Sequence, residues 1–516
     1  MKKILPLLTA AGLLASAGEP VKLIELSWSS PDTDFLRKHI SVMEADSPYD
    51  GIGINLKAEG TVDGKIVQCG YDRISSSVPW KYEWFSKAID DLKKTPFRKF
   101  TDNFLRANLS GTAWTDDRSW EIYCGNFALL ARIARETGMK GLAVDPEMYG
   151  ARLFTFSPAY RLTPEQAYAA ARRRGVEFGK ALFTEFPGIR LIFLLGWMEA
   201  CGPIPGRSSG HNYELLRPFL NGLYEVMPDS AMFFDGCENA SYNAADEADF
   251  CYLAMQYHRQ LKDGVEPGLR GKFERNTRFA PALYLDRFFR NGNGIGAFTR
   301  ALYGANRYSD GYIWTWGERG SWWPTADLVA DPRWKAAFLW KDKSPELPRM
   351  IGLILDPRKN ALSAASFLKK ADLPNDGMAE GMKHWELWSR DKSKGELRIR
   401  KDSVLIENVK SRSCIHRTVK LQEGKLYLLT ARVETNMDNA ADRMNFFVGW
   451  RKGMKWNNPA RHHICEFRKS GKDSEYTAAG IFRVPAGSDA SLQFGLTAQD
   501  QGEYAAFKGI SLYCLD

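Results

Sequence analysis

The first two thirds of the chain alternate regularly between short apolar runs and longer stretches whose apolar residues recur at helical spacing. The apolar runs predict strands at residues 23–29, 51–57, 104–110, 141–145, 189–197, 230–235, 278–286 and 311–316. The helical stretches are residues 34–45, 82–94, 120–137, a helix that begins at Thr163, and residues 212–227, 249–262, 296–305 and 331–340. Eight strand–helix units over some 320 residues match a (β/α)8 TIM barrel in number and size.

Helix boundaries support this pattern. Thr163 is an N-cap, Pro164 takes the first helical position and Gln166 completes a capping box. A doubly wound open sheet is the alternative fold, and it would carry a glycine-rich phosphate loop after its first strand. The residues found there are Ser-Trp-Ser-Ser at 27–30, so we expect a barrel over residues 18–345.

Beyond Pro345 the helical spacing nearly disappears. Short alternating segments take its place, at residues 397–400, 404–408, 425–434, 445–450, 480–484, 491–496 and 509–513. This pattern is typical of an antiparallel β-sandwich. We therefore predict an α/β barrel, a linker at 346–365 and an all-β jelly-roll sandwich at 366–516.

The amino terminus has the pattern of a signal peptide: Lys2 and Lys3, an apolar segment at 4–14, and Ala-Ser-Ala at 15–17. We expect residues 1–17 to be removed and the protein to be exported, to the periplasm, the cell surface or the medium. The later run 192–197 is too short to span a membrane. The net charge is +9, but no run of basic residues is interleaved with aromatic ones, so a nucleic-acid partner is not expected. Eight cysteines permit disulfides in an exported protein, while their pairing and the oligomeric state stay open.

The residues with the clearest chemical potential end the fourth predicted strand, in the stretch 141–150. Side chains alternate along a strand, so Asp145 and Glu147 share one face, and Pro146 ends the pairing. Barrel active sites lie at the carboxyl ends of the strands. The acids expected there are Asp145, Glu147, Glu199, Asp235, Glu238, Asp286 and Glu318, and the aromatics are Trp28, Trp114, Tyr149, Trp197, Tyr242, Trp314, Trp316, Trp322 and Trp323.

Paired carboxyl groups beside flat aromatic rings suit the cleavage of sugars. One carboxyl acts as acid and the other as nucleophile or base, and sugar C–H faces pack on the rings. We assign Glu147 as the general acid, Asp145 as orienting group or nucleophile, and Glu238 or Glu318 as its partner, assisted by Asp235. Expected substrate-binding residues are Arg106, Asn108, Tyr149, Trp197, Asn239, Asp286, Trp316 and Trp322.

No cofactor or metal is expected. His39, His211 and His258 end no predicted strand, which argues against a zinc amidohydrolase, and no Gly-x-Ser-x-Gly elbow is present. Two rival functions stay open: a non-catalytic glycan-binding protein on a degenerate barrel, and a metal-dependent sugar lyase or isomerase. The rival metal site would use Asp145, Glu147, Asp235 and Asp286 to hold magnesium or calcium.

These residues give the first two thirds a resemblance to secreted bacterial (β/α)8 glycoside hydrolases. Asp145-Pro146-Glu147 is similar to the Asp-x-Glu ending of chitinase-like and endo-N-acetylglucosaminidase-like families. That resemblance implies that Glu147 is the acid and that Asp145 orients a 2-acetamido group. This chain has Ala143 at the position where the longer motif has a further upstream aspartate. A second resemblance, to α-galactosidase-like barrels, implies Asp145 as nucleophile with Asp235 or Glu238 as acid.

The carboxyl-terminal part resembles carbohydrate-binding modules of the galactose-binding jelly-roll type. Trp385, Trp388 and the segments 425–432 and 507–513 carry this likeness. It implies a jelly-roll sandwich with Trp450 and Trp456 as ring platforms, although such modules also occur as structural partners of barrels. The expected reaction is hydrolysis of a polysaccharide or host-type glycan, with retention favoured over inversion. The sugar, linkage, anomer and exo or endo action stay open.

Overall fold

The computed structural model of the protein describes residues 20–75, 77–111, 113–147, 152–201, 213–259, 264–290, 294–323, 338–376, 379–380, 382–389, 396–400, 402–407, 412–437, 444–452, 455–463, 474–497 and 503–516. The expected signal peptide and Tyr149 lie outside these residues. The chain divides into two compact units: Met1–Arg287 with Gly304–Leu339, and Phe288–Tyr303 with Trp340–Asp516.

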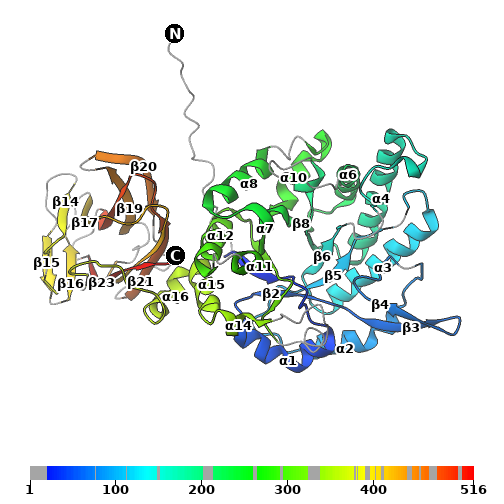
Figure 1. Ribbon diagram of the computed structural model, residues 1–516, viewed down its shortest axis with the longest axis horizontal. Helices are drawn as coiled ribbons and strands as arrows, with labels where there is room; N and C mark the ends of the chain where they lie inside the picture. Colours follow the sequence, from blue (N-terminus) through cyan, green and yellow to red (C-terminus); the bar gives the residue numbers. More distant parts are fainter. Residues whose placement is uncertain are drawn as a thin grey trace, which may run out of the picture. The chain divides into compact units, whose positions relative to one another are not determined.

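Nine parallel strands form a curled sheet in the first unit, in the order β10-β11-β1-β2-β5-β6-β7-β8-β9. Their bounds are β1 (Lys22–Glu25), β2 (Gly51–Ile54), β5 (Phe104–Asn108), β6 (Gly141–Asp145), β7 (Arg190–Phe193), β8 (Met232–Asp235), β9 (Thr277–Phe279), β10 (Ala282–Tyr284) and β11 (Tyr312–Trp316). Helices cover the outside of this sheet (Figure 1). The predicted α/β class with a parallel sheet is therefore confirmed.

The seventh predicted strand, residues 278–286, is two strands in the structure. β9 pairs with β8 and β10 pairs with β11, so the two ends of the strand order are separated by only Ala280 and Pro281. The amide of Ala280 donates to the carbonyl of Asp235 (2.9 Å), and the carbonyl of Pro281 accepts from Trp314 (3.3 Å). Proline has no N–H for a ladder, which explains why the strand divides here.

The helices follow the predicted order. They are α1 (Thr33–Asp46), α2 (Ser86–Lys94), α3 (Asp117–Glu136), α4 (Pro164–Glu185), α5 (Trp197–Ala200), α6 (Leu216–Val226), α7 (Asn239–Asn243), α8 (Glu247–Arg259), α10 (Arg270–Asn276), α11 (Leu285–Arg290), α12 (Gly294–Tyr308) and α14 (Trp340–Lys343). Short additions are the 3-10 helices η1 (Tyr82–Phe85), η2 (Pro158–Tyr160) and η3 (Pro267–Leu269), the hairpin β3 (Ala58–Val62) and β4 (Lys65–Cys69), and the pair β12 (Gly320–Ser321) and β13 (Phe338–Leu339). The predicted helix 331–340 falls mostly outside the described residues.

Two helices next to the candidate site, α4 and α6, pack closely together. A Cβ atom at Gly175 of α4 would collide with the carbonyl oxygen of Phe219, and one at Gly222 of α6 with that of Arg172. Glycine at both contact points therefore allows the two backbones to touch. This fixes the start of α6, which follows the residue at the centre of the site described below.

The capping box of α4 is confirmed. The Thr163 side chain accepts from the amide of Gln166, and the Gln166 side chain accepts from the amide of Thr163. We expect Thr163→Ala to lower the free energy of unfolding by about 1 kcal/mol, because an amide at the helix start loses its acceptor. Thr163→Ser keeps the hydroxyl and should unfold like the wild type in urea. An equal loss in both variants would contradict this role.

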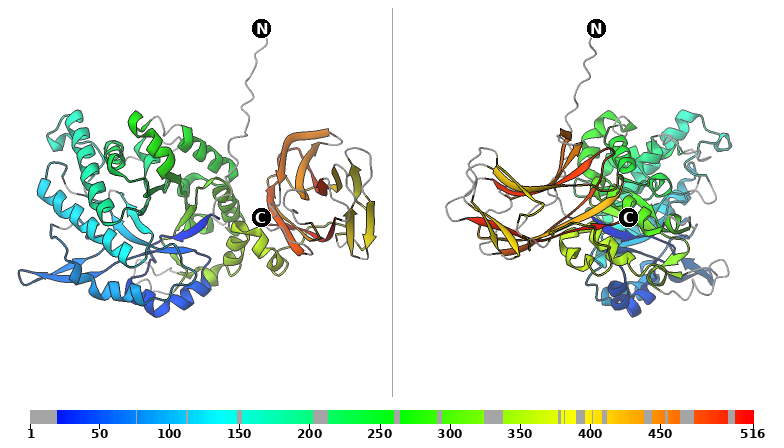
Figure 2. Two further views of the ribbon diagram at one scale, coloured as in Figure 1. Left: turned by 180° about the vertical axis from the view of Figure 1, so that it is seen from behind. Right: turned by 60° about the vertical axis from the view of Figure 1, so that its left-hand side comes forward.

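The second unit is a sandwich of two five-stranded antiparallel sheets, as predicted. One sheet has the order β14-β17-β22-β19-β20 and the other β15-β16-β23-β18-β21, and Figure 2 shows the two layers. The bounds are β14 (Glu386–Ser389), β15 (Glu396–Arg400), β16 (Ser403–Glu407), β17 (Arg412–Val419), β18 (Leu426–Thr435), β19 (Met444–Lys452), β20 (Lys455–His463), β21 (Ser474–Arg483), β22 (Asp489–Thr497) and β23 (Tyr504–Cys514).

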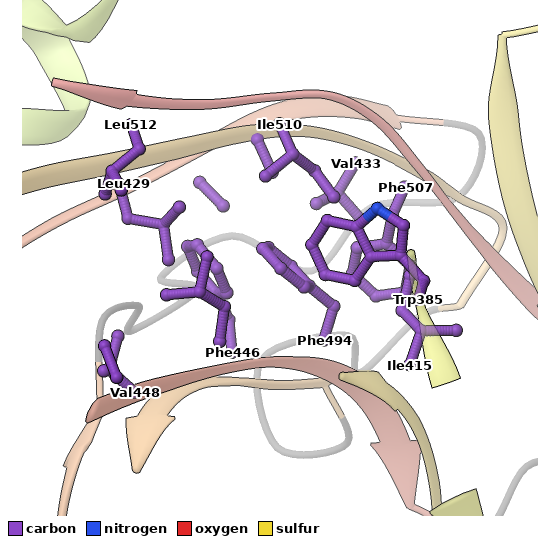
Figure 3. Packing of buried hydrophobic residues seen from close by; sticks show 14 of the residues in the cluster. Trp385, Ile415, Leu429, Val433, Phe446, Val448, Phe494, Phe507, Ile510 and Leu512 are labelled. Carbon is purple, nitrogen blue, oxygen red and sulfur yellow. The ribbon is translucent and has the colours of Figure 1, made fainter. Parts of the chain in front are cut away.

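Aromatic and branched side chains from both sheets fill the sandwich (Figure 3). The ring of Phe494 lies 4.5 Å from that of Phe446 and 5.7 Å from that of Trp385. Trp450 belongs to the same core and is 3% exposed, which corrects its expected part as a ring platform. The side chain of Trp456 lies outside the described residues.

The segment expected as a linker, 346–365, contains two helices, α15 (Leu347–Leu355) and α16 (Pro357–Ala364). Leu347, Ile351 and Ile354 of α15 are buried, so this segment is packed rather than extended. Seven of the eight cysteines are described, and none of these seven forms a disulfide. Among the described helices, none has the length and apolar character needed to cross a membrane.

Candidate functional site

The carboxyl ends of β5 and β6 place three polar side chains on the inner face of the curled sheet. Phe104 and Ala143 belong to the core cluster enclosed by this sheet. Side chains alternate along strands, so Arg106 and Asn108 follow Phe104 inward, and Asp145 follows Ala143. Asn108 and Asp145 are register partners on neighbouring strands and lie side by side. The sequence prediction that these residues meet at one edge is supported.

A buried tyrosine identifies which acids come together. Burial, followed by the negative charges of Glu147, Glu199, Asp145 and Glu238, raises the pKa of Tyr213 well above its usual range. These acids follow three successive strands, β6, β7 and β8. We call Asp145, Glu147, Glu199, Glu238 and Tyr213 the carboxylate cluster. Tyr213 is 6% exposed and stays protonated at neutral pH, so its hydroxyl is a hydrogen-bond donor among acids.

Asp145 and Glu147 are held by a tight turn after β6. The Asp145 Oδ1 atom accepts the backbone N–H of Glu147 at 2.9 Å, and the carbonyl of Asp145 accepts from Leu109 at 2.6 Å. Asp145 is 6% exposed and Glu147 is partly exposed. The Oδ1 atom of the neighbouring Asn108 is buried and has no hydrogen-bond partner among the described residues. An acceptor of this kind suits a ligand hydroxyl.

Glu238 is fixed by the loop between β8 and α7. Its amide donates to the carbonyl of Leu194 at 3.0 Å, and the Tyr242 hydroxyl donates to its Oε1 atom at 2.9 Å. Cys237, just before it, has a φ of +40°, a conformation that costs energy for a residue with a side chain. The ring of Tyr242 is partly exposed and lies 5.9 Å from the ring of Tyr284.

Asp235 occupies a different position from the one predicted. It is in register with Phe193 on the outer face, while Phe234 points inward, and its side chain is fully buried. Its Oδ2 atom accepts the amide of Met198 at 3.0 Å, and its Oδ1 atom accepts that of Cys237 at 3.0 Å. Burial raises the pKa of Asp235 to about 6. Asp235 therefore joins the loops that carry Glu199 and Glu238 and does not face a substrate.

Asp286 and Glu318 lie at the exits of β10 and β11. Asp286 is 2% exposed, and its Oδ2 atom accepts the backbone amides of Glu318 (2.7 Å) and Arg319 (3.4 Å). Asp286 therefore holds the backbone after β11, and its predicted substrate-binding role stays a prediction. Glu318 is partly exposed but does not belong to the carboxylate cluster as defined. Of the two candidate partners of Glu147, Glu238 acts on the pKa of Tyr213.

The predicted aromatic platforms divide into exposed and buried rings. Trp28 is 44% exposed, and its ring lies 6.1 Å from that of the partly exposed Trp316 at the exit of β11. Trp197 and Trp322 are buried against Tyr224 and Tyr49 respectively, so neither presents a face to a sugar. Tyr149 and the side chain of Asn239 lie outside the described residues.

Arg106 and Glu25 stand beside this aromatic edge. Arg106 lies over the ring of Tyr71 at 4.8 Å and donates to the carbonyl of Ser27 at 3.0 Å. Glu25, at the end of β1, is fully buried, and burial raises its pKa to about 7. Its Oε1 atom accepts from the Ser27 amide (3.1 Å) and the Ser29 hydroxyl (3.2 Å), whereas Oε2 has no partner among the residues described.

Sequence reasoning missed Glu25 and Tyr213 and gave Glu199 no role. Glu25 lies inside an apolar run and carries no motif. Tyr213 precedes a predicted helix, and only the tertiary fold brings it to the acids of three strands. Within the described part of the chain, no group of three or more histidine, cysteine or acidic side chains is arranged to hold a metal ion.

No protein-family model matches the chain, and no curated protein is significantly similar to it in sequence. Among solved structures, the enzymatically active domain of tailspike protein 4 of bacteriophage CBA120 is 13% identical and covers 28% of this chain, with a TM-score of 0.22. The match spans 21% of that tailspike chain. The CBM22-1 xylan-binding domain from Paenibacillus barcinonensis Xyn10C is 11% identical, with a TM-score of 0.22, over 27% of this chain and 92% of that domain. TmCBM61, solved with β-1,4-galactotriose, is 12% identical with a TM-score of 0.20, over 28% of this chain and 97% of that one. The chain is thus similar over about a quarter of its length to carbohydrate-binding modules and to part of a phage tailspike.

Proposed function

We propose that the protein is a glycoside hydrolase whose active site is the carboxylate cluster. The observation that carries this proposal is that four acids from the exits of β6, β7 and β8 all act on the pKa of the buried Tyr213. Hydrolysis of a glycosidic bond requires two carboxyl groups across that bond. Asp145, Glu147 and Glu238 supply more than the required pair.

The roles follow from what holds each group. Glu147 is the most accessible acid of the three and protonates the glycosidic oxygen as the bond from that oxygen to the anomeric carbon breaks. Glu238, fixed by Tyr242, attacks the anomeric carbon or activates the water that does so. Asp145 is held by the Glu147 amide and orients the sugar, next to the open acceptor of Asn108. The Tyr213 hydroxyl stays protonated under the influence of these carboxylates.

The same proposal includes the finer architecture. We take β9 and β10 as one barrel strand interrupted at Pro281, which makes the curled sheet an eight-stranded (β/α)8 barrel with this site at its carboxyl end. The sandwich is taken as a jelly-roll that binds glycan, with the 44% exposed Trp388 of β14 as the candidate platform. Export of the protein, based on residues 1–17, also belongs to the proposal.

A substrate screen tests the proposal. The full chain is incubated with aryl glycosides and with mucin-type and plant polysaccharides, with and without EDTA, and released reducing ends are measured. We expect hydrolysis that EDTA does not change. Binding without turnover on any glycan would favour a carbohydrate receptor, and loss of activity with EDTA would favour a metal-dependent lyase or isomerase.

Trp28 offers a separate test of where the sugar binds. If the Trp28 ring contacts a sugar face, Trp28→Ala should raise KM about tenfold and change kcat little, because aromatic stacking contributes on the order of 1 kcal/mol beyond area burial. Tyr252→Ala is the matched control, since this aromatic side chain of α8 is 48% exposed. Equal KM values for Trp28→Ala and the control would remove Trp28 from the binding surface.

A further inference from the structure

A groove of about 450 Å³ lies on the first unit, between α4, α6 and the segment that leads into α10. Tyr168 and Arg172 of α4, Arg217 and Asn221 of α6, and Glu266 and Arg270 line it, with backbone of the intervening residues. The groove thus combines three arginines, one carboxylate and an aromatic ring that is 41% exposed. None of these side chains was singled out by the sequence.

The carboxylate in this groove is already neutralised. Arg172 forms ion pairs with both Glu266 and Glu225, and the Glu266 amide donates to Asn221 at 3.1 Å. Arg217 and Arg270 have no ion-pair partner among the residues that the structure describes. Within the described ranges, Arg270 makes one hydrogen bond, from its Nε–H to the carbonyl of Val265 at 3.4 Å. Two guanidinium groups are therefore available to an anion in the groove.

The groove lies at the same end of the sheet as the carboxylate cluster. α4 and α6 follow β6 and β7, and helices that return along a parallel sheet begin at the carboxyl ends of its strands. Tyr168 and Arg217 are in the first turns of these helices, and Arg217 comes four residues after Tyr213. The groove wall at Gly264 packs on Cys201, the residue that follows α5 and its Glu199.

We propose that this groove binds a carboxylate- or sulfate-bearing sugar unit, and that the substrate is an acidic polysaccharide with a charged unit at a distance from the cleaved bond. This inference rests on the proposed hydrolase function for the cleaved bond, but the binding site itself does not. Arg217 and Arg270 receive the anion, because the planar guanidinium matches carboxylate and sulfate oxygens in a bidentate manner. Tyr168 offers its ring to the sugar face.

Calorimetric titration of the full chain tests the groove. The Glu147→Gln variant is used so that no probe is consumed, and the probes are trigalacturonate, a sulfated disaccharide and neutral galactotriose. We expect the acidic probes to bind, the neutral one to bind at least about tenfold more weakly, and Arg217→Ala/Arg270→Ala to lose about tenfold in affinity for the acidic probes. The affinity should fall with rising salt.

Two further variants separate a built site from general attraction. Arg118→Ala/Arg132→Ala removes two exposed arginines of α3, outside the groove lining, whose side chains are 71% and 45% exposed. This control should bind the acidic probes like the parent. Arg217→Lys/Arg270→Lys keeps both charges but not the bidentate geometry and should recover only part of the affinity. Thermal unfolding of every variant confirms that it is folded.

Each outcome decides one question. The inference is overturned if neither acidic probe binds, if the neutral probe binds equally well, or if the control pair loses as much affinity as Arg217→Ala/Arg270→Ala. Arginine-dependent binding in a protein that cleaves no glycan would support the groove as a binding site for acidic sugars and contradict the proposed hydrolase function. Cleavage of a neutral glycan without acidic binding would do the reverse.

Discussion

Replacing Glu147 by glutamine should lower kcat on a natural glycan by roughly three orders of magnitude, the middle of the range for loss of a general acid. The amide keeps the size of the side chain and its place after Asp145, but it has no proton of suitable acidity for the glycosidic oxygen. Fold and substrate binding should change little, because Glu147 is partly exposed. The loss should shrink on aryl glycosides with strongly acidic leaving groups, which depart without protonation.

Glu238→Gln distinguishes the second role. As nucleophile or base, Glu238 acts on the anomeric carbon or its water, so its replacement should cost as much on an activated aryl glycoside as on a natural glycan. Glu121→Gln, an exposed acid of α3, is the control and should retain full activity. Full activity of Glu147→Gln on the natural substrate would reject the assignment. The same dependence on leaving group in both variants would mean that the roles are not divided as proposed.

The part of the site that could be predicted is local in the chain. Strand alternation alone puts Asp145 and Glu147 on one face, and Pro146 between them ends the strand, so no long-range contact is needed to infer the pair. Arg106 and Asn108 were predicted in the same way. The order of strands and helices could also be predicted, because each apolar run and each capping signal is contained in a few residues.

The predictions that differ from the structure concern residues whose surroundings are set by neighbours distant in sequence. Asp235 ends its strand as expected, but the register with Phe193 turns it to the outer face, one residue away from an inward position. Trp197 was expected as a platform, yet Tyr224 and Phe273 cover it from two other helices. Tyr213 could not be singled out from the sequence, because only the fold relates it to acids that follow three different strands. Residues 346–365 were expected as a linker, and the structure has α15 and α16 there, with Leu347 and Ile351 buried.

Glu25 should make the first unit less stable as pH rises. Its pKa is raised from 4.5 to about 7 by burial, so the folded protein holds this proton more tightly than the unfolded chain. For such a group the stability is fully present below pH 4.5 and is lost as pH rises through 7. The shift in pKa from 4.5 to about 7 corresponds to a loss of about 3 kcal/mol in the free energy of unfolding, which is complete above pH 7.

Glu25→Gln should abolish this loss. The amide oxygen can accept from Ser27 and Ser29 as Oε1 does, and the amide nitrogen replaces an oxygen that has no partner among the described residues. The variant should therefore match the wild type near pH 4 and be more stable by about 3 kcal/mol near pH 8. Urea denaturation of both proteins across this pH range measures the difference between their free energies of unfolding. Groups that titrate alike in both proteins do not contribute to that difference.

Asp235→Asn is the informative comparison, because the pKa of Asp235 is likewise raised, to about 6, whereas both of its carboxylate oxygens are hydrogen-bonded. Both carboxylate oxygens of Asp235 accept backbone amides, from Met198 and Cys237, so an asparagine must point its NH2 group at one of these donors. The variant should be about 1 to 3 kcal/mol less stable than the wild type at pH 4, the cost of an unsatisfied buried donor, and this deficit should shrink as pH rises through about 6, because only the wild type must then bury a charge. Stabilisation of Asp235→Asn at pH 4 would show that the two amide donors do not need both oxygens, and Asp235 would no longer be needed to hold the loops of Glu199 and Glu238. An unchanged pH slope in Glu25→Gln would likewise mean that the Glu25 carboxyl is solvated in solution.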